Sequence, residues 1–234
     1  MFSLPLGAVM TIAIFIYAMG IQNLGLYLNV HSIILVGGGT LAILFFTSPI
    51  NALRNLVRET KNLFSTPLHF DQVRKDLLSI ANGKLTATKS SDELVAYAQD
   101  LWEQGISPDL FVVLISQKRK EIEQRAVDAI QCLKNLAKYP PALGMAGTVM
   151  GIVTLFQSLD GGKDKIGPAL AVAMTATFFG LMIANAIVMP LSDRLQVRQI
   201  SDGNYLQNIY QVLLLINQDE SSHLIEEEVT SRAG

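Results

Sequence analysis

Charged side chains are missing from long stretches of this 234-residue sequence, in which 50% of the residues are hydrophobic and only 16% are charged. Residues 1–50 contain no Lys, Arg, Asp or Glu, and neither do residues 141–159 and 166–191. A helix of about 20 apolar residues is long enough to cross a bilayer. The missing charge therefore excludes an ordinary soluble domain and predicts an integral membrane protein.

Cysteine is represented by Cys132 alone, which excludes an intramolecular disulfide and a metal site built from several cysteines. We expect Cys132 to be a reduced packing thiol. No stretch combines basic residues with interleaved aromatics, so nucleic acid is not an expected partner. The first basic residue is Arg54, so the N-terminal apolar run lacks the positive segment of a signal peptide and is expected to stay as a helix.

Four apolar segments stand out, at residues 4–21, 33–48, 142–159 and 167–191. The links between the first two and between the last two, residues 22–31 and 160–165, are short. Short links join neighbouring antiparallel helices, so the spans should form two hairpins. The expected fold class is an all-α integral membrane protein with four transmembrane helices in two hairpins and a helical cytoplasmic loop domain.

The positive charge is concentrated between the two hairpins, where residues 51–140 carry 13 of the 18 Lys and Arg residues. Because cytoplasmic loops retain Lys and Arg, this loop and both termini should face the cytoplasm. Apolar residues at helical spacing predict helices in the loop. The expected segments are a hairpin at 1–50, a loop domain at 51–140, a second hairpin at 141–191, and a helix with an acidic tail at 192–234.

No carboxylate lies in any of the four apolar segments, although membrane proteins that carry protons use an intramembrane Asp, Glu or His as the titrating group. His31 lies at the edge of a span. An ion moved by this protein must therefore find its carboxylate on another chain, which predicts an obligate partner. The spans also lack the serine–histidine or paired-aspartate sets of intramembrane proteases, so we expect no enzyme activity, no catalytic residue and no bound metal.

Small residues recur at helical spacing in the last two spans. Gly147 and Gly151 form a GxxxG pattern, and Ala173 and Gly180 belong to a stripe of small side chains in the following span. Small side chains let membrane helices approach closely. We expect these four residues to serve helix packing.

Two threonines interrupt the small residues at matching depth. Thr148 lies 12 residues before Asp160, and Thr177 lies 10 residues after Gly167. At about 1.5 Å per residue, both lie roughly 15–18 Å below the same hairpin tip, near the middle of the membrane. Each hydroxyl could bond only the carbonyl one turn back, or it could line an ion path. Spacing alone leaves both readings open.

Two prolines mark the cytoplasmic ends of these spans. Pro141 begins the third span, where a missing N–H costs nothing, and Pro190 lies near the end of the fourth, where proline makes a kink. Alternatively, each proline frees backbone groups at a moving gate.

The same region resembles a known family. The sequences PALGMAGTVMG at 141–151, IGPALAVAMTATFFG at 166–180 and the stretch 185–195 around Pro190 resemble the third and fourth spans of the flagellar stator A subunit. That subunit belongs to the superfamily that also holds the TolQ and ExbB energisers. Residues 32–40 add a weaker resemblance in the second span.

The resemblance implies a homo-pentamer around two copies of a B-type partner, whose single transmembrane helix bears the ion-carrying aspartate. It implies transport of H⁺ or Na⁺ without a cofactor, and a place in the bacterial inner membrane among its lipids. Thr148 and Thr177 fall on the family's pore-lining threonines, so an ion-path role is the favoured reading. Pro141 and Pro190 fall on its two functional prolines.

One part of the loop departs from the family pattern. Flagellar stators carry an arginine, a glycine and then a leucine–glutamate pair that meet the rotor, whereas here only Gly83 and Leu85 fit. The charged residues nearby that could substitute in a rotor contact are Lys84, Lys89, Asp92 and Glu93. Their alternative is a solvated surface.

The function favoured by these observations is that of an A-type stator subunit, which converts ion flow into torque for flagellar motility. A ring that energises a different envelope or defence machine is the first alternative. TolQ and ExbB chains have one span before the loop, whereas this chain has a hairpin there, which favours the flagellar branch. A non-conducting membrane scaffold is the second alternative.

Overall fold

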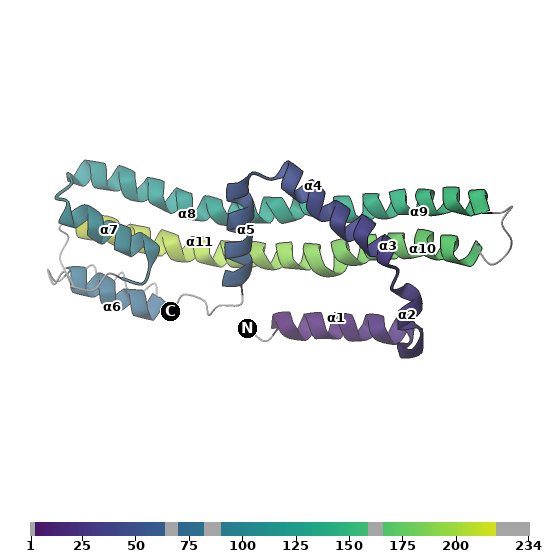
Figure 1. Ribbon diagram of the computed structural model, residues 1–234. Coiled ribbons are helices and arrows are strands. Elements are labelled where there is room, and N and C mark those ends of the chain that lie inside the picture. The colour runs from purple at the N-terminus through teal and green to yellow at the C-terminus, as the bar shows by residue number, and fades with distance from the viewer. Residues whose placement is uncertain (1–2, 64–69, 82–89, 159–165, 219–234) are drawn as a thin grey trace. The chain divides into compact units, whose positions relative to one another are not determined.

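The chain is almost entirely helical. The computed structural model describes residues 3–63, 70–81, 90–158 and 166–218, and these residues form helices and short turns with no strand among them (Figure 1). Two compact units are present: the first consists of Met1–Phe64 and Asp128–Leu195, and the second of Ser65–Val127 and Gln196–Gly234. The all-α fold class expected from the sequence is confirmed.

The first unit begins with apolar helices separated by one sharp turn. The elements are α1 (Ser3–Met19), the 3₁₀ turn η1 (Ile21–Asn23), α2 (Leu24–Tyr27), α3 (Val30–Ile33), the π-helical segment η2 (Ile34–Gly38) and α4 (Gly39–Thr47). Gly20 has φ of 74°, a backbone conformation that favours glycine, and it ends α1. Asn29 begins the next run, because its side-chain oxygen accepts from the amides of His31 and Ser32.

Two long helical runs form the rest of the apolar part. One comprises α8 (Pro108–Leu136) and α9 (Tyr139–Ser158), and the other α10 (Ile166–Met182), the π-helical segment η5 (Ile183–Val188) and α11 (Met189–Asn217). Pro140 and Pro141 have no N–H to donate to the last turn of α8, so a new helix starts there. Pro190 likewise cannot donate, and it is the second residue of α11, one position beyond the start that follows η5.

Three stretches among the described residues are long and apolar enough to cross a membrane: Val30–Thr47, Pro108–Gln157 and Ile166–Asn217. Leu6–Met19 is a shorter apolar helix. Together they are compatible with the four expected spans, with one helix before the short link at Gly20 and one after it.

The first unit contains a cluster of buried apolar side chains from several of its helices. Its buried members are Leu44, Ile130, Cys132, Leu133, Leu136, Ala137, Val188 and Leu195. The helix α5 (Ile50–Asn62) packs against this cluster through Leu53 and Leu56, with Leu63 just beyond its end. The first unit therefore extends past residue 50. It includes α5 because the apolar side chains of α5 pack on the buried cluster of this unit.

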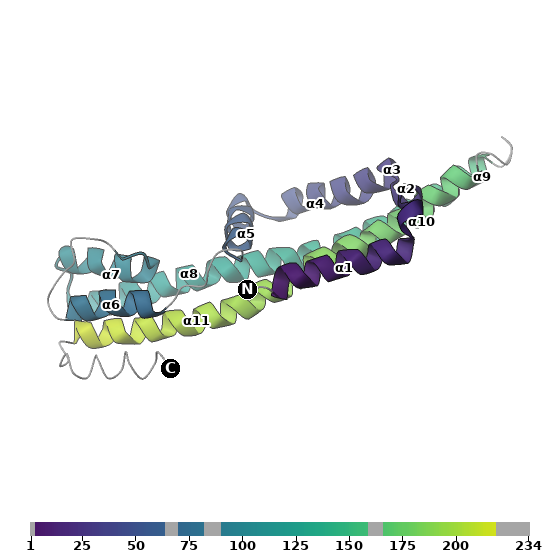
Figure 2. The ribbon, with the colours of Figure 1, turned by 90° about the horizontal axis from the view of Figure 1, so that it is seen from below.

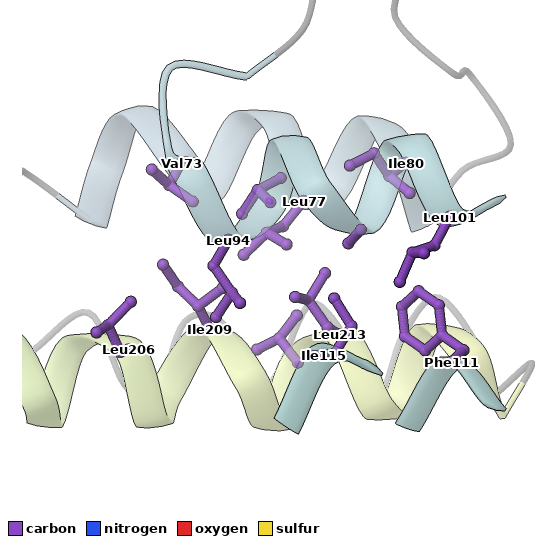
Figure 3. Packing of buried hydrophobic residues seen from close by; sticks show 13 residues of the cluster. Val73, Leu77, Ile80, Leu94, Leu101, Phe111, Ile115, Leu206, Ile209 and Leu213 are labelled. Atoms are coloured by element: carbon purple, nitrogen blue, oxygen red, sulfur yellow. The ribbon is translucent and has the colours of Figure 1, made fainter. Parts of the chain in front are cut away.

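The second unit has its own hydrophobic core (Figure 3). It is formed by α6 (Phe70–Ala81), α7 (Glu93–Glu103) and the adjoining parts of α8 and α11. Figure 3 shows side chains of all four helices pointing toward one another, among them Leu77, Leu94, Ile115 and Ile209. Because these side chains leave water together, this part of the loop is an ordered helical domain.

Candidate functional site

The small residues of α9 and α10 lie where the two helices come closest. A methyl group added at Gly151 would lie 2.6 Å from Cβ of Ala173, and one at Gly147 would lie 2.5 Å from Cβ of Ala176. One added at Gly180 would lie 2.4 Å from the carbonyl oxygen of Pro140. Real Cβ atoms do not approach other atoms this closely, so the contact requires glycine at all three positions.

Close packing brings Thr148 of α9 and Thr177 of α10 together. Their Oγ1 atoms are 2.5 Å apart, within hydrogen-bond distance, and both side chains are half-buried. The Thr148 hydroxyl also lies 3.0 Å from the Gly144 carbonyl oxygen and 3.3 Å from that of Ala173. The Thr177 hydroxyl lies 3.3 Å from the same Gly144 oxygen. The sequence placed these threonines at one depth, and the structure brings their hydroxyls into contact.

This arrangement holds two hydroxyls and two carbonyl oxygens around one point between apolar helices. A hydroxyl has one proton and two lone pairs, so each threonine can turn its proton to a carbonyl and present its oxygen to a cation. No Asp or Glu is present in residues 141–158 or 166–191 to titrate beside them. The pair can therefore assist a cation or a proton carrier but cannot by itself replace a titrating group.

The two sequence-predicted prolines lie at helix boundaries of the first unit. Pro141 is the third residue of α9, next to Pro140, whose carbonyl group contacts Gly180. Pro190 is the second residue of α11 and lies two positions after the end of η5 at Val188. In η5, Asn185 Nδ2 donates to the Leu181 carbonyl oxygen at 3.1 Å. Sequence reasoning had not singled out Pro140 or Asn185.

A second hydroxyl pair was also missed. Ser32 of α3 is fully buried, and its Oγ lies 2.8 Å from Thr175 Oγ1 and 3.1 Å from the Val172 carbonyl oxygen. Thr175 and Thr177 point to different sides of α10, since successive helical residues are about 100° apart. Thr175 thus holds α10 against α3 while Thr177 faces α9. The signal in the sequence is weak, because a lone serine and a lone threonine in separate spans do not indicate that they meet.

Of the four loop residues considered for a rotor contact, Lys84 and Lys89 lie outside the described residues. Asp92 is 3% exposed and caps α7, because its Oδ1 accepts from the amides of Leu94 and Val95 at 2.9 and 3.0 Å. Its Oδ2 accepts from the Tyr205 hydroxyl at 3.1 Å. Burial raises the pKa of Asp92 more than these hydrogen bonds lower it.

Glu93 is more exposed and belongs to an ionic network on α7 and α8. Its carboxylate lies 3.1 Å from Lys118 Nζ and 2.9 Å from Arg125 Nη1. Burial acts to raise the pKa of Glu93, but the hydrogen bonds and charges of Lys118 and Arg125 outweigh it and lower the pKa. Arg125 also pairs with Glu121. The two carboxylates and the two cations thus form one network of ion pairs on the surface of the second unit.

With this geometry in place, the comparison with protein families is decisive. The family model described as the MotA/TolQ/ExbB proton channel family matches residues 86–207 of the 234. The chain belongs to this family. The match includes Thr148, Thr177, Pro141 and Pro190, so the resemblance expected from the spans is confirmed.

Individual members of the MotA/TolQ/ExbB family align with most of the chain. "Motility protein A" of Cereibacter sphaeroides is 25% identical over 234 residues, which cover 94% of this chain and 89% of that protein. "Chemotaxis protein PomA" of Vibrio alginolyticus is 23% identical, with 87% and 83% covered. The solved C. jejuni MotAB structure superposes with a TM-score of 0.80 at 16% identity, covering 97% of this chain and 93% of that one. The family fold thus extends along the chain.

Proposed function

We propose that this protein is the A-type subunit of an ion-driven stator that supports flagellar motility. In this function the chain surrounds a B-type partner, ions pass between the two subunits, and the ring of A subunits delivers torque through its cytoplasmic part. The observation that carries the proposal is the Thr148–Thr177 hydroxyl pair, which lies between apolar helices that have no carboxylate of their own.

The comparisons support the motility assignment through the names of the relatives. Proteins called "Motility protein A" and "Chemotaxis protein PomA" align with 87–94% of this chain. A solved structure of similar fold is described as the flagellar MotAB stator complex from Bacillus subtilis, with a TM-score of 0.77. The apolar helix before Gly20 adds support, because it gives the chain two apolar helical runs ahead of the loop.

The proposed assembly contains five A chains and two B chains in the bacterial inner membrane, with both termini and the second unit in the cytoplasm. The B chain contributes one transmembrane helix with an ion-carrying aspartate, since the apolar segments of this chain contain no Asp or Glu. The transported ion is H⁺ or Na⁺, no catalytic step or cofactor is involved, and the flagellar rotor is the load. Labelling of a cysteine at Gln22 by an impermeant thiol reagent in intact cells tests the orientation.

The test of the function is the response of motor speed and ion flux to the two threonines. The chain is co-expressed with its cognate B-type subunit, and speed is measured against Na⁺ concentration at fixed pH. A hydroxyl oxygen can join the shell of a dehydrated Na⁺, whereas a proton needs only a titrating group and water. Thr177→Ala and Thr148→Ala should therefore impair a Na⁺-driven motor strongly and a H⁺-driven motor mildly.

Two controls separate this role from packing. Thr177→Ser keeps the hydroxyl and should retain speed. Thr154→Ala removes an exposed hydroxyl of α9 that bonds only the Met150 carbonyl, and it should leave flux unchanged. If Thr148→Ala and Thr177→Ala assemble with the B subunit and neither changes flux or speed, the threonines do not line the ion path.

A further inference from the structure

The helix α5 follows the apolar run Val30–Thr47 after a turn of two residues and has two distinct faces. The inner face packs Leu53 and Leu56 on the buried cluster of the first unit. The outer face is exposed and contains all three basic residues of α5 together with two large apolar side chains. We call this outer face the basic face; its residues are Ile50, Arg54, Val57, Arg58 and Lys61.

The charge of the basic face has one sign. The only acidic residue of α5, Glu59, lies on the half-buried side, where its Oε2 accepts from Asn62 Nδ2 at 3.4 Å. Ile50 and Val57 are 77% and 54% exposed between the basic side chains. Such a combination of cations and apolar side chains on one side of a helix suits the boundary between headgroups and acyl chains.

The position of α5 in the first unit agrees with that boundary. The cluster under α5 includes Leu136 and Val188, so it lies where α9 begins and η5 meets α11. Figures 1 and 2 show α5 running across the direction of α9 and α10. The helices α9 and α10 belong to the stretches that can cross a membrane, and a bilayer crossed by them would have α5 along its surface, at the ends of these helices.

The last turn of α4, shortly before α5 in the sequence, exposes apolar side chains. Phe45 and Phe46, in the last turn of α4, are 71% and 91% exposed. Along the chain, exposed apolar side chains are therefore followed within a few residues by the exposed basic side chains of α5. A bilayer offers acyl chains and then anionic headgroups in the same order.

We propose that the basic face of α5 binds the anionic phospholipid headgroups of the leaflet at this end of the spans. Arg54, Arg58 and Lys61 contact the phosphates, while Ile50 and Val57 enter the acyl boundary. Binding fixes the depth of the first unit in the membrane. It requires only that the helices cross a bilayer, so it does not depend on the flagellar assignment.

The test compares lipids of different charge on the full chain purified in detergent. Native mass spectrometry counts bound lipid during titration with short-chain phosphatidylglycerol, which is anionic, or phosphatidylcholine, which is zwitterionic. The wild-type chain should prefer phosphatidylglycerol, and Arg54→Gln/Lys61→Gln should weaken that binding at least about fivefold, as expected for charges near an anionic surface. Binding of phosphatidylcholine should not change.

A matched control removes the same charge elsewhere. Lys75→Gln/Lys120→Gln neutralises two exposed lysines of the second unit and should leave lipid binding unchanged. Equal binding of both lipids by the wild type, or the same loss in the control, overturns the proposal. Inorganic phosphate that displaces the lipid at equal concentration would point to an anion site instead. A smaller oligomer with unchanged lipid affinity in Arg54→Gln/Lys61→Gln would assign the face to a contact between copies of the chain.

Discussion

Among single residues, Asp92 shows how burial and hydrogen bonding compete. It caps α7 and accepts from Tyr205, yet its pKa is raised because burial disfavours the charged form. The charged or titratable groups near Tyr205 and Asp92 include Glu93, Asp76 and Asp202, all of them acidic, so none relieves the buried charge. The hydrogen bonds of Asp92 therefore hold the start of α7 to α11, and burial of its charged form costs free energy that depends on pH.

The Asp92→Asn variant should reveal that cost. A carboxyl group whose folded pKa is raised loses its contribution to stability as pH rises from its ordinary pKa through the raised value. Asparagine caps a helix as well as aspartate and carries no charge. The variant should therefore gain stability relative to wild type as pH rises through that window and keep the difference above it. The fluorescence of Trp102, which is the only tryptophan and stacks on Phe111, reports thermal unfolding of the second unit.

Glu93→Gln is a control, because its stability relative to wild type should change with pH in the opposite direction. The pKa of Glu93 is lowered, so its ion pairs stabilise the fold above its ordinary pKa, and that contribution is lost as pH falls through the lowered value. Asp92→Ala also lacks the carboxyl but removes the cap, so it should be about 1 kcal/mol less stable than Asp92→Asn at every pH. A pH-independent difference between Asp92→Asn and wild type would show that the buried carboxylate carries no such cost.

The Ser32–Thr175 pair gives a second prediction for single residues. Thr175→Val keeps the side-chain shape and leaves the buried Ser32 hydroxyl with only the Val172 carbonyl. Hydrogen bonds between membrane helices average about 0.6 kcal/mol, so the midpoint of thermal unfolding should fall by roughly 1–4 °C. The reaction of buried Cys132 with a fluorescent maleimide reports unfolding of the first unit. Thr154→Val, at an exposed position, should leave the midpoint unchanged. If its midpoint falls as far as that of Thr175→Val, the Ser32–Thr175 hydrogen bond does not stabilise the first unit.

At the scale of helices, the sequence predicted the apolar spans and the threonine depth but not the tertiary contacts. Uncharged stretches indicate membrane helices because composition and length alone determine that outcome. The meeting of Ser32 with Thr175 depends on which faces of α3 and α10 pack together, and one sequence does not give that. The π-helical segments η2 and η5 also escaped prediction, since ordinary helical residues form them. The grouping of α5 with the first unit follows from packing on Leu133 and Leu136, beyond the reach of local periodicity.

The α9–α10 contact yields a prediction for these elements. In Gly180→Ala the added methyl would lie 2.4 Å from the Pro140 carbonyl oxygen, so the helices must separate at that level. Overpacking of this kind costs about 1–3 kcal/mol. The maleimide assay at Cys132 should show a lower unfolding midpoint, and the Thr148–Thr177 contact should weaken. Gly167→Ala on the same helix meets no atom within 4 Å and should be neutral, and equal behaviour of the two variants would contradict the packing argument.

For the whole molecule, two features point to assembly with another chain. The exposed apolar side chains of α9, such as Met145, Val149 and Phe156, leave this helix uncovered on one side. The threonine pair lacks a carboxylate in its own spans. A lipid environment alone satisfies the first feature but not the second, because ion transfer through hydrocarbon needs a titrating group.

The chain purified alone should therefore be unable to conduct ions, and co-expression with the B-type subunit should yield a complex of five A and two B chains. Mass photometry or native mass spectrometry gives the stoichiometry, and flux into proteoliposomes gives the conductance. Replacing the aspartate in the partner's transmembrane helix by asparagine should abolish flux while leaving the complex intact, because that change removes the titrating group and keeps the shape. Thr177→Ala in the same complex should reduce Na⁺ flux without abolishing it, since the hydroxyl assists the ion and the carboxylate carries it. A stable chain that conducts ions without any partner would refute this division of roles.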